Sequence, residues 1–574
     1  MPPFFSPSLA QTSQQSWPWL GWGLVLGLTI VNLILRWGAM ATPATLVFDE
    51  VYYVQFALDY LQGVPFFDLH PPLGKLAIAA GIWLFYAVTT GNGLPAGLTP
   101  ETLDPLSYRW LNGGLGTAIP LLAGWVAWEW SYGTDPRRRW AFTLLAMGLT
   151  SLDGLALVES RLALLHPALV VAGLAALGAW GRAAHSSWAW GWRSLAGICL
   201  GSAIAVKWNG AGYLLALGLL SLGPGLNWAT RLFTLGVLPA LTYSLWWWPH
   251  LQLMGQNLGS LHSEIFFTHL GLTASHPYQS PWFSWPLLLR PMAYFYEDLG
   301  DSRAIALYGT GNPVLWWLST AALIMVLNQW LCPLISKVWT HRIEILGAMK
   351  SNNTQALCQR QAHRQPAGSP FLNAFRLYTP IHPNIGHPPT GQPPYDYVAP
   401  SEPLHEQGKQ GIDPTKTSCI GRGNRAPTPI PGIGRGISAV HCFAWAKPRL
   451  SVMHPTGHST QNSKLKTQNL KFLSPTPPPP IFLCVTYLTL WLPWAGISRS
   501  TFLYHYQPAA LLAELALAWL MGRWLTAPRP SWRWAGWTLL GAMLASFGFW
   551  LPLWLGWPLP LEALAWRWWV GSWL

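Results

Sequence analysis

Apolar runs of membrane-spanning length recur along the chain and constrain its fold more than any other feature. A helix needs about 20 mainly apolar residues to cross the roughly 30 Å hydrocarbon core of a bilayer. Hydrophobic residues make up 51% of the chain and tryptophan alone contributes 40 residues, a composition typical of membrane proteins. By the length criterion there are about eleven spans, at residues 18–38, 105–130, 140–157, 162–181, 194–223 (counted as two), 231–249, 312–331, 481–497, 502–522 and 534–556. We therefore predict an all-α integral membrane protein with several crossings.

Arginines near the ends of these runs predict the side of the membrane that each end faces. The cluster Arg137-Arg138-Arg139 follows the run 105–130 directly, and clusters of this kind stay cytoplasmic. Two crossings back from the cluster, the amino terminus is also cytoplasmic. The loop that contains Asp49 then lies on the outer (exoplasmic) face. The N-terminus has no basic region and no small-residue cleavage site, which favours a retained first span over a cleaved signal.

The run 194–223 is long enough for one helix or for two short ones. Two helices keep Arg231 on the same side as Arg182, and this parity favours a break near Lys207. The loop 250–309 then reaches the outer face as well. Residues 73–90 are barely of spanning length, and we expect them to form a helix along the membrane interface.

Residues 336–480 differ in composition from the rest of the chain. Between 341 and 480 there are 21 of the 51 prolines and half of the 16 histidines, but one of the 40 tryptophans. The same stretch has 15 Lys and Arg and 5 Asp and Glu, so it accounts for +10 of the net charge of +13. Because the basicity belongs to one segment, it does not indicate a nucleic-acid-binding face. We predict a disordered insertion here, with a soluble regulatory domain as the alternative.

The predicted domains follow from these boundaries. Residues 1–17 form a disordered tail, and 18–335 form an N-terminal membrane domain. That domain includes a loop at 41–104, expected to hold the active site, and the outer loop 250–309. The insertion 336–480 separates it from the C-terminal transmembrane helices at 481–574.

The polar stretch 48–75, FDEVYYVQFALDYLQGVPFFDLHPPLGK, stands out in a chain with only 10% charged residues. Ionisable groups beside a membrane are costly to bury and mark a functional site by default. Asp49 and Glu50 are adjacent, so on a helix they point about 100° apart and can take different roles. His70 and Lys75 close the stretch. A polar loop with helix-capping acids is the alternative interpretation.

Asp49-Glu50 after a first span, followed by Gly63 and HPPLGK at 70–75, resembles the first exoplasmic loop of the protein O-mannosyltransferases. These are multi-spanning glycosyltransferases of the GT-C class. The outer-loop sequence HPYQSPWFSWPLLLRP at 276–291 is similar to the bacterial form, which lacks the soluble β-trefoil repeats of eukaryotic members.

Further segments resemble the same family in the same order along the chain. They contribute Arg109 (in YRWLNGGLGT), Asp153 and Arg161 (in DGLALVESR), Lys207 (in AVKWNG), Asn312 (in GNP), and Arg499 and His505 (before and within FLYHYQP). The family usually continues after Arg161 with LLD, whereas this chain has Leu164-Leu165-His166, and a neutral imidazole does not replace a carboxylate charge.

The resemblance implies an enzyme of the bacterial plasma membrane that needs no catalytic metal and no cofactor. It would move mannose, with inversion, from a polyprenyl-phosphate donor to Ser or Thr hydroxyls of exported polypeptides. Asp49 would be the general base, and Glu50 would orient the acceptor or the sugar. The expected donor-binding residues are His70, Lys75, Arg109, Asp153, Arg161, Lys207, Arg499 and His505, whose cations would stabilise the leaving phosphate. The expected partners are the lipid-linked donor, the polypeptide acceptor and membrane lipids.

Two other functions stay open at this stage. Another GT-C transferase could share the scaffold and glycosylate a lipid or glycan. A transporter or an inactive protein is the alternative from a different class, although no internal repeats are evident. The six cysteines form no CxxC pair, and the spacing of His262, Glu264, His269 and His276 matches no standard metal site.

Overall fold

The computed structural model describes residues 17–329 and 478–573, apart from the single positions 39, 92, 224 and 273. The described residues all belong to one compact unit. Nearly all of the predicted tail 1–17 and of the predicted insertion 336–480 lies outside the described residues. Those two predictions therefore stay predictions.

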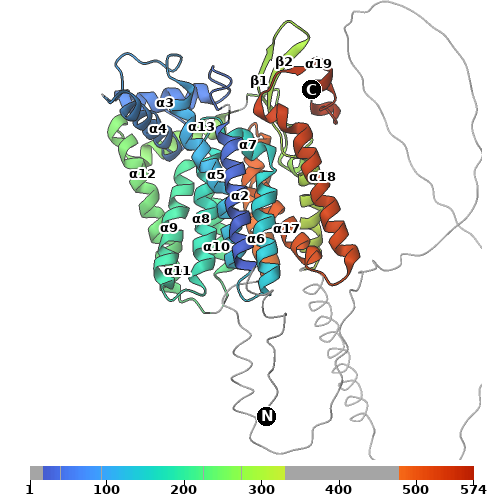
Figure 1. The fold of residues 1–574 in the computed structure, drawn as a ribbon. Helices are drawn as coiled ribbons and strands as arrows, with labels where there is room; N and C mark the ends of the chain where they lie inside the picture. The colour runs from blue at the N-terminus through green and yellow to red at the C-terminus, as the bar shows by residue number, and fades with distance from the viewer. Residues whose placement is uncertain are drawn as a thin grey trace, which may run out of the picture. The chain divides into compact units, whose positions relative to one another are not determined.

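Helices occur at all of the predicted spans, and most of them stand side by side in one bundle (Figure 1). Their bounds are α2 (Trp17–Trp37), α5 (Pro105–Trp130), α6 (Pro136–Ser151), α8 (His166–Ala183), α9 (Ala189–Val206), α10 (Ala211–Leu220), α11 (Trp228–Leu232) continuing through a π-helical turn into α12 (Leu238–Met254), the helix Pro313–Gln329, α16 (Pro479–Trp491), α17 (Gln507–Leu525) and α18 (Pro530–Leu555).

By length and apolar composition, four of the described helices could each cross a membrane, and five could if a bent pair counts as one span. Two of the four are α2 and α18, whose outward faces are apolar: Trp19 is 82% exposed and Trp534 is 71% exposed. Exposed apolar side chains in such numbers fit a lipid environment better than water. The predicted number of about eleven crossings, and the side that each end faces, stay predictions.

Local sequence signals set the ends of several helices. Asp104 and Asp135 each precede a proline, and each side chain accepts a hydrogen bond from a backbone N–H of the first turn, at α5 and α6 respectively. Gly63 ends α3 (Glu50–Gln62) in the left-handed conformation (φ 72°), which glycine adopts without steric cost.

The bundle packs tightly around α8, which contacts α5 on one side and α9 on another. Glycines permit this closeness. A Cβ placed on Gly173 of α8 would lie 2.2 Å from the ring of Tyr213, and one on Gly178 would lie 2.4 Å from the ring of Trp125. Small residues at helix contacts are the usual means of close packing inside membranes.

The predicted break near Lys207 is confirmed. Helix α9 ends at Val206, Lys207 is extended (φ −150°, ψ 144°), and a single 3₁₀ turn (Trp208–Gly210) leads into α10. A Cβ on Gly210 would lie 2.5 Å from the backbone of Ala203, so the chain reverses closely against α9. The break places a lysine at the end of a helix rather than along its length.

Short helices cover the end of the bundle at which Lys207 lies. Figure 1 shows α3 and α4 (Leu73–Thr90) lying across this end, with α13 (Leu258–Gly271) beside them. The crosswise course of α4 agrees with the predicted interfacial helix, although its length and composition would also allow a crossing.

The all-α prediction was incomplete, because the outer loop 250–309 contains two strands. Strands β1 (Met292–Asp298) and β2 (Arg303–Gly309) pair antiparallel, and β3 (Leu559–Pro560) adds to β2 after α18. Buried and partly buried positions alternate in the first half of β1, which is the period of a strand with one covered face. This sheet delivers Tyr294 to the site described next.

Candidate active site

The backbone around Asp49 is held in an unusual conformation. Phe48, the residue before it, adopts φ 53°, a left-handed conformation that a bulky side chain rarely takes. The Phe48 ring is fixed by edge contacts with Tyr294 (5.2 Å between ring centroids) and Tyr504 (6.1 Å). Strain of this kind persists only where the surroundings enforce it. Tertiary packing therefore sets the direction in which Asp49 points.

Asp49 lies half-buried at the start of α3, where the Tyr53 hydroxyl donates a long hydrogen bond of 3.5 Å to its carboxylate. Burial raises the pKa of Asp49 to about 6; the nearby Lys207 opposes this rise, and the negative charges of Glu159 and Asp68 add to it. A carboxylate with such a pKa is ionised at neutral pH and is a stronger base than an ordinary aspartate.

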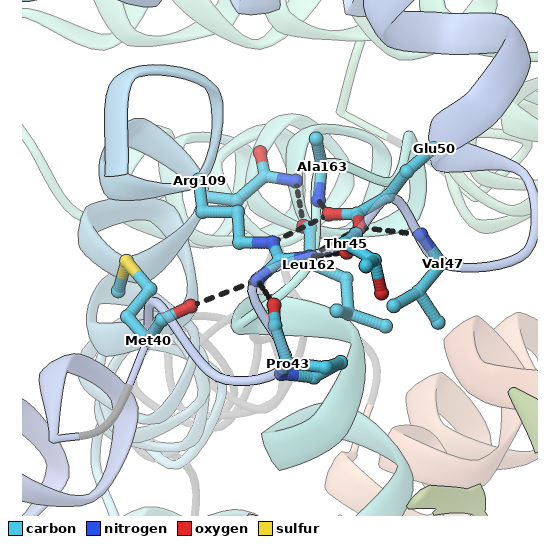
Figure 2. Close-up of polar contacts among 9 residues, drawn as sticks. Met40, Pro43, Thr45, Val47, Glu50, Arg109, Leu162 and Ala163 are labelled. Carbon is cyan, nitrogen blue, oxygen red and sulfur yellow. Dashed lines mark hydrogen bonds and ion pairs between the residues drawn. The ribbon is translucent and has the colours of Figure 1, made fainter. Parts of the chain in front are cut away.

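Glu50 forms a buried ion pair with Arg109 (Figure 2). Its two carboxylate oxygens accept two hydrogen bonds from the guanidinium, at 2.8 and 2.6 Å, and two more from the backbone N–H groups of Val47 and Ala163. Glu50 and Arg109 are both fully buried. All oxygens of this carboxylate are therefore engaged within the protein.

Arg109 is equally engaged. Its remaining N–H groups donate to the carbonyl oxygens of Met40, Pro43 and Thr45, so all five donors of the guanidinium have protein acceptors (Figure 2). The pair joins the loop before Asp49 to α5. This differs from the predicted roles, in which Arg109 met the donor phosphate and Glu50 met the acceptor or sugar.

Lys75, like Arg109, is buried and bonded to groups of the protein. Its ammonium is 1% exposed, pairs with the carboxylate of Asp68 and donates to the carbonyl of His70 at 2.7 Å. It also lies 5.8 Å from the ring centroids of Phe56 and Phe66. Lys75 therefore holds the loop that carries His70, whereas the sequence predicted that it binds the donor.

Asp153 and Arg161 sit at the two ends of the short helix α7 (Gly154–Ser160). Asp153 accepts hydrogen bonds from the first-turn N–H groups of α7 and from Trp316 Nε1, at 3.1–3.2 Å. Arg161 donates to the carbonyl oxygen of Trp554 in α18 at 2.8 Å. Neither residue lines the cavity that His70, Lys207, Arg499 and His505 share, and their predicted donor-binding role stays a prediction.

The other four predicted donor-binding residues, His70, Lys207, Arg499 and His505, line one cavity of about 510 Å³. The rest of its wall is mainly apolar and comes from the start of α10, from α13 and from the segment after α16. Residues 69–71 and 493–505 meet here, although residues 330–477, which stand between the two halves of the chain, are not described. Asp49 does not line the cavity, but it is close enough to Lys207 for their charges to interact.

Arg499 contrasts with Arg109. Arg499 is partly buried. Its one hydrogen bond among the described residues is long, 3.4 Å from Nη1 to the carbonyl oxygen of Ser500. Its guanidinium therefore has donors available to the cavity, and a planar guanidinium suits a phosphate. His505 accepts the Phe502 N–H at Nδ1 (3.0 Å), which leaves Nε2 for the cavity.

Glu159, Tyr294 and Tyr504 were missed by the sequence reasoning. Glu159 lies 3.0 Å from His166, and Tyr294 donates to Glu159 at 2.7 Å. Tyr504 places its ring 5.3 Å from the Lys207 ammonium. Glu159 had an available signal in its position as a carboxylate within an apolar run. Tyr504 had one in its place within FLYHYQP, and Tyr294 had none.

No group of three or more His, Cys, Asp or Glu side chains suited to a metal occurs in the part of the chain that the structure describes. His262 and His269 bond instead to Tyr243 (2.5 Å) and to the carbonyl of Leu69 (3.1 Å).

The fold and the site together define a class of protein. It is a helical membrane protein whose polar site lies at one end of the bundle, beside a mainly apolar cavity lined by the cationic side chains of Lys207 and Arg499. Sequence comparison then identifies the family. Residues 26–254 match the dolichyl-phosphate-mannose-protein mannosyltransferase family, and residues 254–362 and 458–573 match the C-terminal four-transmembrane region of protein O-mannosyltransferase. These matches cover well over half of the chain, which therefore belongs to the protein O-mannosyltransferase family.

Several characterised proteins are similar to the chain. A polyprenol-phosphate-mannose–protein mannosyltransferase of Mycobacterium tuberculosis is 26% identical over 410 residues, 57% of this chain and 74% of the relative. That of Corynebacterium glutamicum is 24% identical over 397 residues, 53% of this chain and 71% of the relative. The Saccharomyces cerevisiae protein O-mannosyltransferase Pmt1–Pmt2 complex, solved bound to the sugar donor, shares the fold with a TM-score of 0.60 at 14% identity, covering 96% of this chain and 92% of that one.

Proposed function

We propose that this protein transfers mannose from a polyprenyl-phosphate donor to Ser or Thr hydroxyls of exported polypeptides. The bacterial relatives carry the name of this activity. The observation that carries the proposal is the cavity lined by Lys207 and Arg499, with Asp49 close to Lys207. We further propose that the reaction takes place on the exoplasmic side of the plasma membrane and uses no catalytic metal or cofactor.

The cavity suits an amphiphilic anion. Its walls include Leu215, Leu490 and Ile497, which can contact prenyl carbons, while the ammonium and guanidinium groups can bind the phosphate. Opposite charges in an apolar environment attract more strongly than in water. The donor phosphate would therefore bind between Lys207 and Arg499, and its sugar would extend toward Asp49.

The chemistry is a single displacement at the anomeric carbon. The acceptor oxygen forms a bond to this carbon, the bond to the phosphate oxygen breaks, and the configuration inverts. Asp49 takes the hydroxyl proton, a contribution of about 10²–10⁴-fold for a general base. The departing polyprenyl phosphate needs no proton, because Lys207 and Arg499 stabilise its negative charge.

In this proposal the Glu50–Arg109 pair acts on the reaction indirectly. It fixes the loop 40–47, and the loop leads directly to Phe48 and Asp49. A general base contributes fully only when its position is held to within a fraction of an ångström.

Transfer of labelled mannose from polyprenyl-phosphate-mannose to a Ser/Thr-rich peptide in membranes tests the proposal. Asp49→Asn should lower the rate at least about a hundredfold. Asp59→Asn is the matched control, because Asp59 lies on the same helix, accepts a hydrogen bond from Gln55 and does not line the cavity. It should leave transfer unchanged.

Two results would count against the proposal. Wild-type transfer that survives in Asp49→Asn would remove Asp49 as the base. Absence of peptide mannosylation by the wild-type membranes, with label appearing in lipid or glycan instead, would replace the polypeptide acceptor.

A further inference from the structure

His166 lies between a buried cation and a buried anion at the edge of the cavity. Its Nε2 is 3.1 Å from the Lys207 ammonium, and its Nδ1 is 3.0 Å from a carboxylate oxygen of Glu159. The three side chains are 0–4% exposed. The other Glu159 oxygen accepts a hydrogen bond of 2.7 Å from the Tyr294 hydroxyl.

The chemistry of these groups determines which of them donates a proton and which accepts at each contact. An ammonium group can only donate, so His166 Nε2 must accept from Lys207. The proton of a neutral imidazole then lies on Nδ1 and faces Glu159. Tyr294 donates to the other oxygen. The four groups therefore lie in contact in the order Tyr294, Glu159, His166, Lys207, and the step from Glu159 to His166 is a charge contact at 3.0 Å.

The negative charge that faces Lys207 through this chain comes from Glu159. The imidazole carries no charge of its own, but it spans the gap between the two ions and transmits the polarisation of one to the other. Other groups act on the same ammonium: Asp49 through its charge, Tyr504 through its ring, and Arg499 as the second cation of the cavity.

We propose that Glu159, acting through His166, is a positioning residue that orients the Lys207 ammonium toward the donor phosphate. This inference rests on the proposed function, because it assumes that Lys207 meets that phosphate. With one N–H committed to His166, the ammonium retains two donors for the ligand. Tyr294 extends the chain to β1, so the sheet of the outer loop also determines where the lysine points.

The deciding experiment moves the carboxylate from position 159 to position 166, where it would contact Lys207 directly. Glu159→Gln removes the charge and should lower kcat/KM for the donor by about 10–100-fold, the usual effect of losing an outer partner of a binding group. KM for the acceptor peptide should not change. The double variant Glu159→Gln/His166→Asp restores a carboxylate directly beside Lys207 and should recover most of the lost donor kcat/KM. Glu264→Gln, an exposed acid on α13, is the control for loss of one negative charge.

A second readout does not depend on catalysis. Polyprenyl phosphate should raise the thermal unfolding temperature of the wild type and of the double variant, and much less that of Glu159→Gln. Tyr294→Phe, which keeps the ring and removes one hydroxyl, should lie between them. If wild-type membranes fail to transfer mannose while this pattern of stabilisation holds, the proposed reaction is wrong and the positioning role stands.

The inference is overturned by either of two results with folded variants. One is a wild-type donor kcat/KM in Glu159→Gln. The other is a double variant that is no better than Glu159→Gln, both in donor kcat/KM and in stabilisation by polyprenyl phosphate.

Discussion

Glu50→Gln and Asp49→Asn make the same chemical change at adjacent positions, and we expect opposite consequences. The Glu50 carboxylate accepts four hydrogen bonds, two from Arg109 and two from backbone N–H groups. A glutamine at this position presents an amide nitrogen, which cannot accept, in place of one oxygen. Two of the four bonds are then lost, and Arg109 is left buried without an anion.

The cost is that of breaking a buried ion pair by removing one partner, about 3–5 kcal/mol. Glu50 and Arg109 are both fully excluded from solvent, so water cannot replace the lost contacts. Asp49 is half-buried and has one long hydrogen bond from Tyr53, so Asn at position 49 should leave stability nearly unchanged.

Thermal unfolding of the purified proteins in lipid nanodiscs, followed by tryptophan fluorescence, measures the difference. Glu50→Gln should unfold several degrees below the wild type and retain part of its transfer activity well below that temperature. Asp49→Asn should unfold like the wild type and lack activity. A Glu50→Gln protein that unfolds at the wild-type temperature but transfers no mannose would refute the structural role of Glu50 and make it a catalytic residue.

Three further predictions concern Asp49, Arg499 and Gly154. Burial raises the pKa of Asp49 to about 6, and the protonated carboxyl cannot accept a proton. The peptide kcat/KM should therefore fall about tenfold per pH unit below pH 6 and level off above it. The same fall at low pH in the residual activity of Asp49→Asn would contradict this. Arg499→Ala should raise KM for the donor about 10–100-fold through loss of charged hydrogen bonds. Arg303→Ala, on the exposed part of β2, should leave the donor KM unchanged. Equal donor KM values for the two variants in steady-state assays would remove Arg499 from the phosphate site. Gly154→Ala should lower the free energy of unfolding by about 1–3 kcal/mol, because the added Cβ would lie 2.0 Å from the Trp554 ring; an unchanged unfolding temperature would show that α18 yields easily at this contact.

The sequence alone determined the helices of the bundle and the position of the interruption at Lys207. Long apolar runs can do little else beside a membrane, and arginine placement resolved the ambiguous run 194–223 into α9 and α10. It also pointed to the family, because the polar residues of the family's motifs occur in the same order along this chain. The strands β1 and β2 escaped prediction, since their pairing with each other and with β3 depends on residues far apart in the chain.

Only the tertiary structure decided which charged residues face the cavity. Arg109 and Arg499 look alike in the sequence, each close to the start of a helix beside aromatic residues. Glu50 and the loop 40–47 together accept from all five donors of Arg109, whereas Arg499 keeps most of its donors for the cavity. The role of His166 was likewise open until Glu159 was found behind it. Hydrogen-bond partners depend on which segments meet in space, and the spacing of residues along one chain does not contain that information.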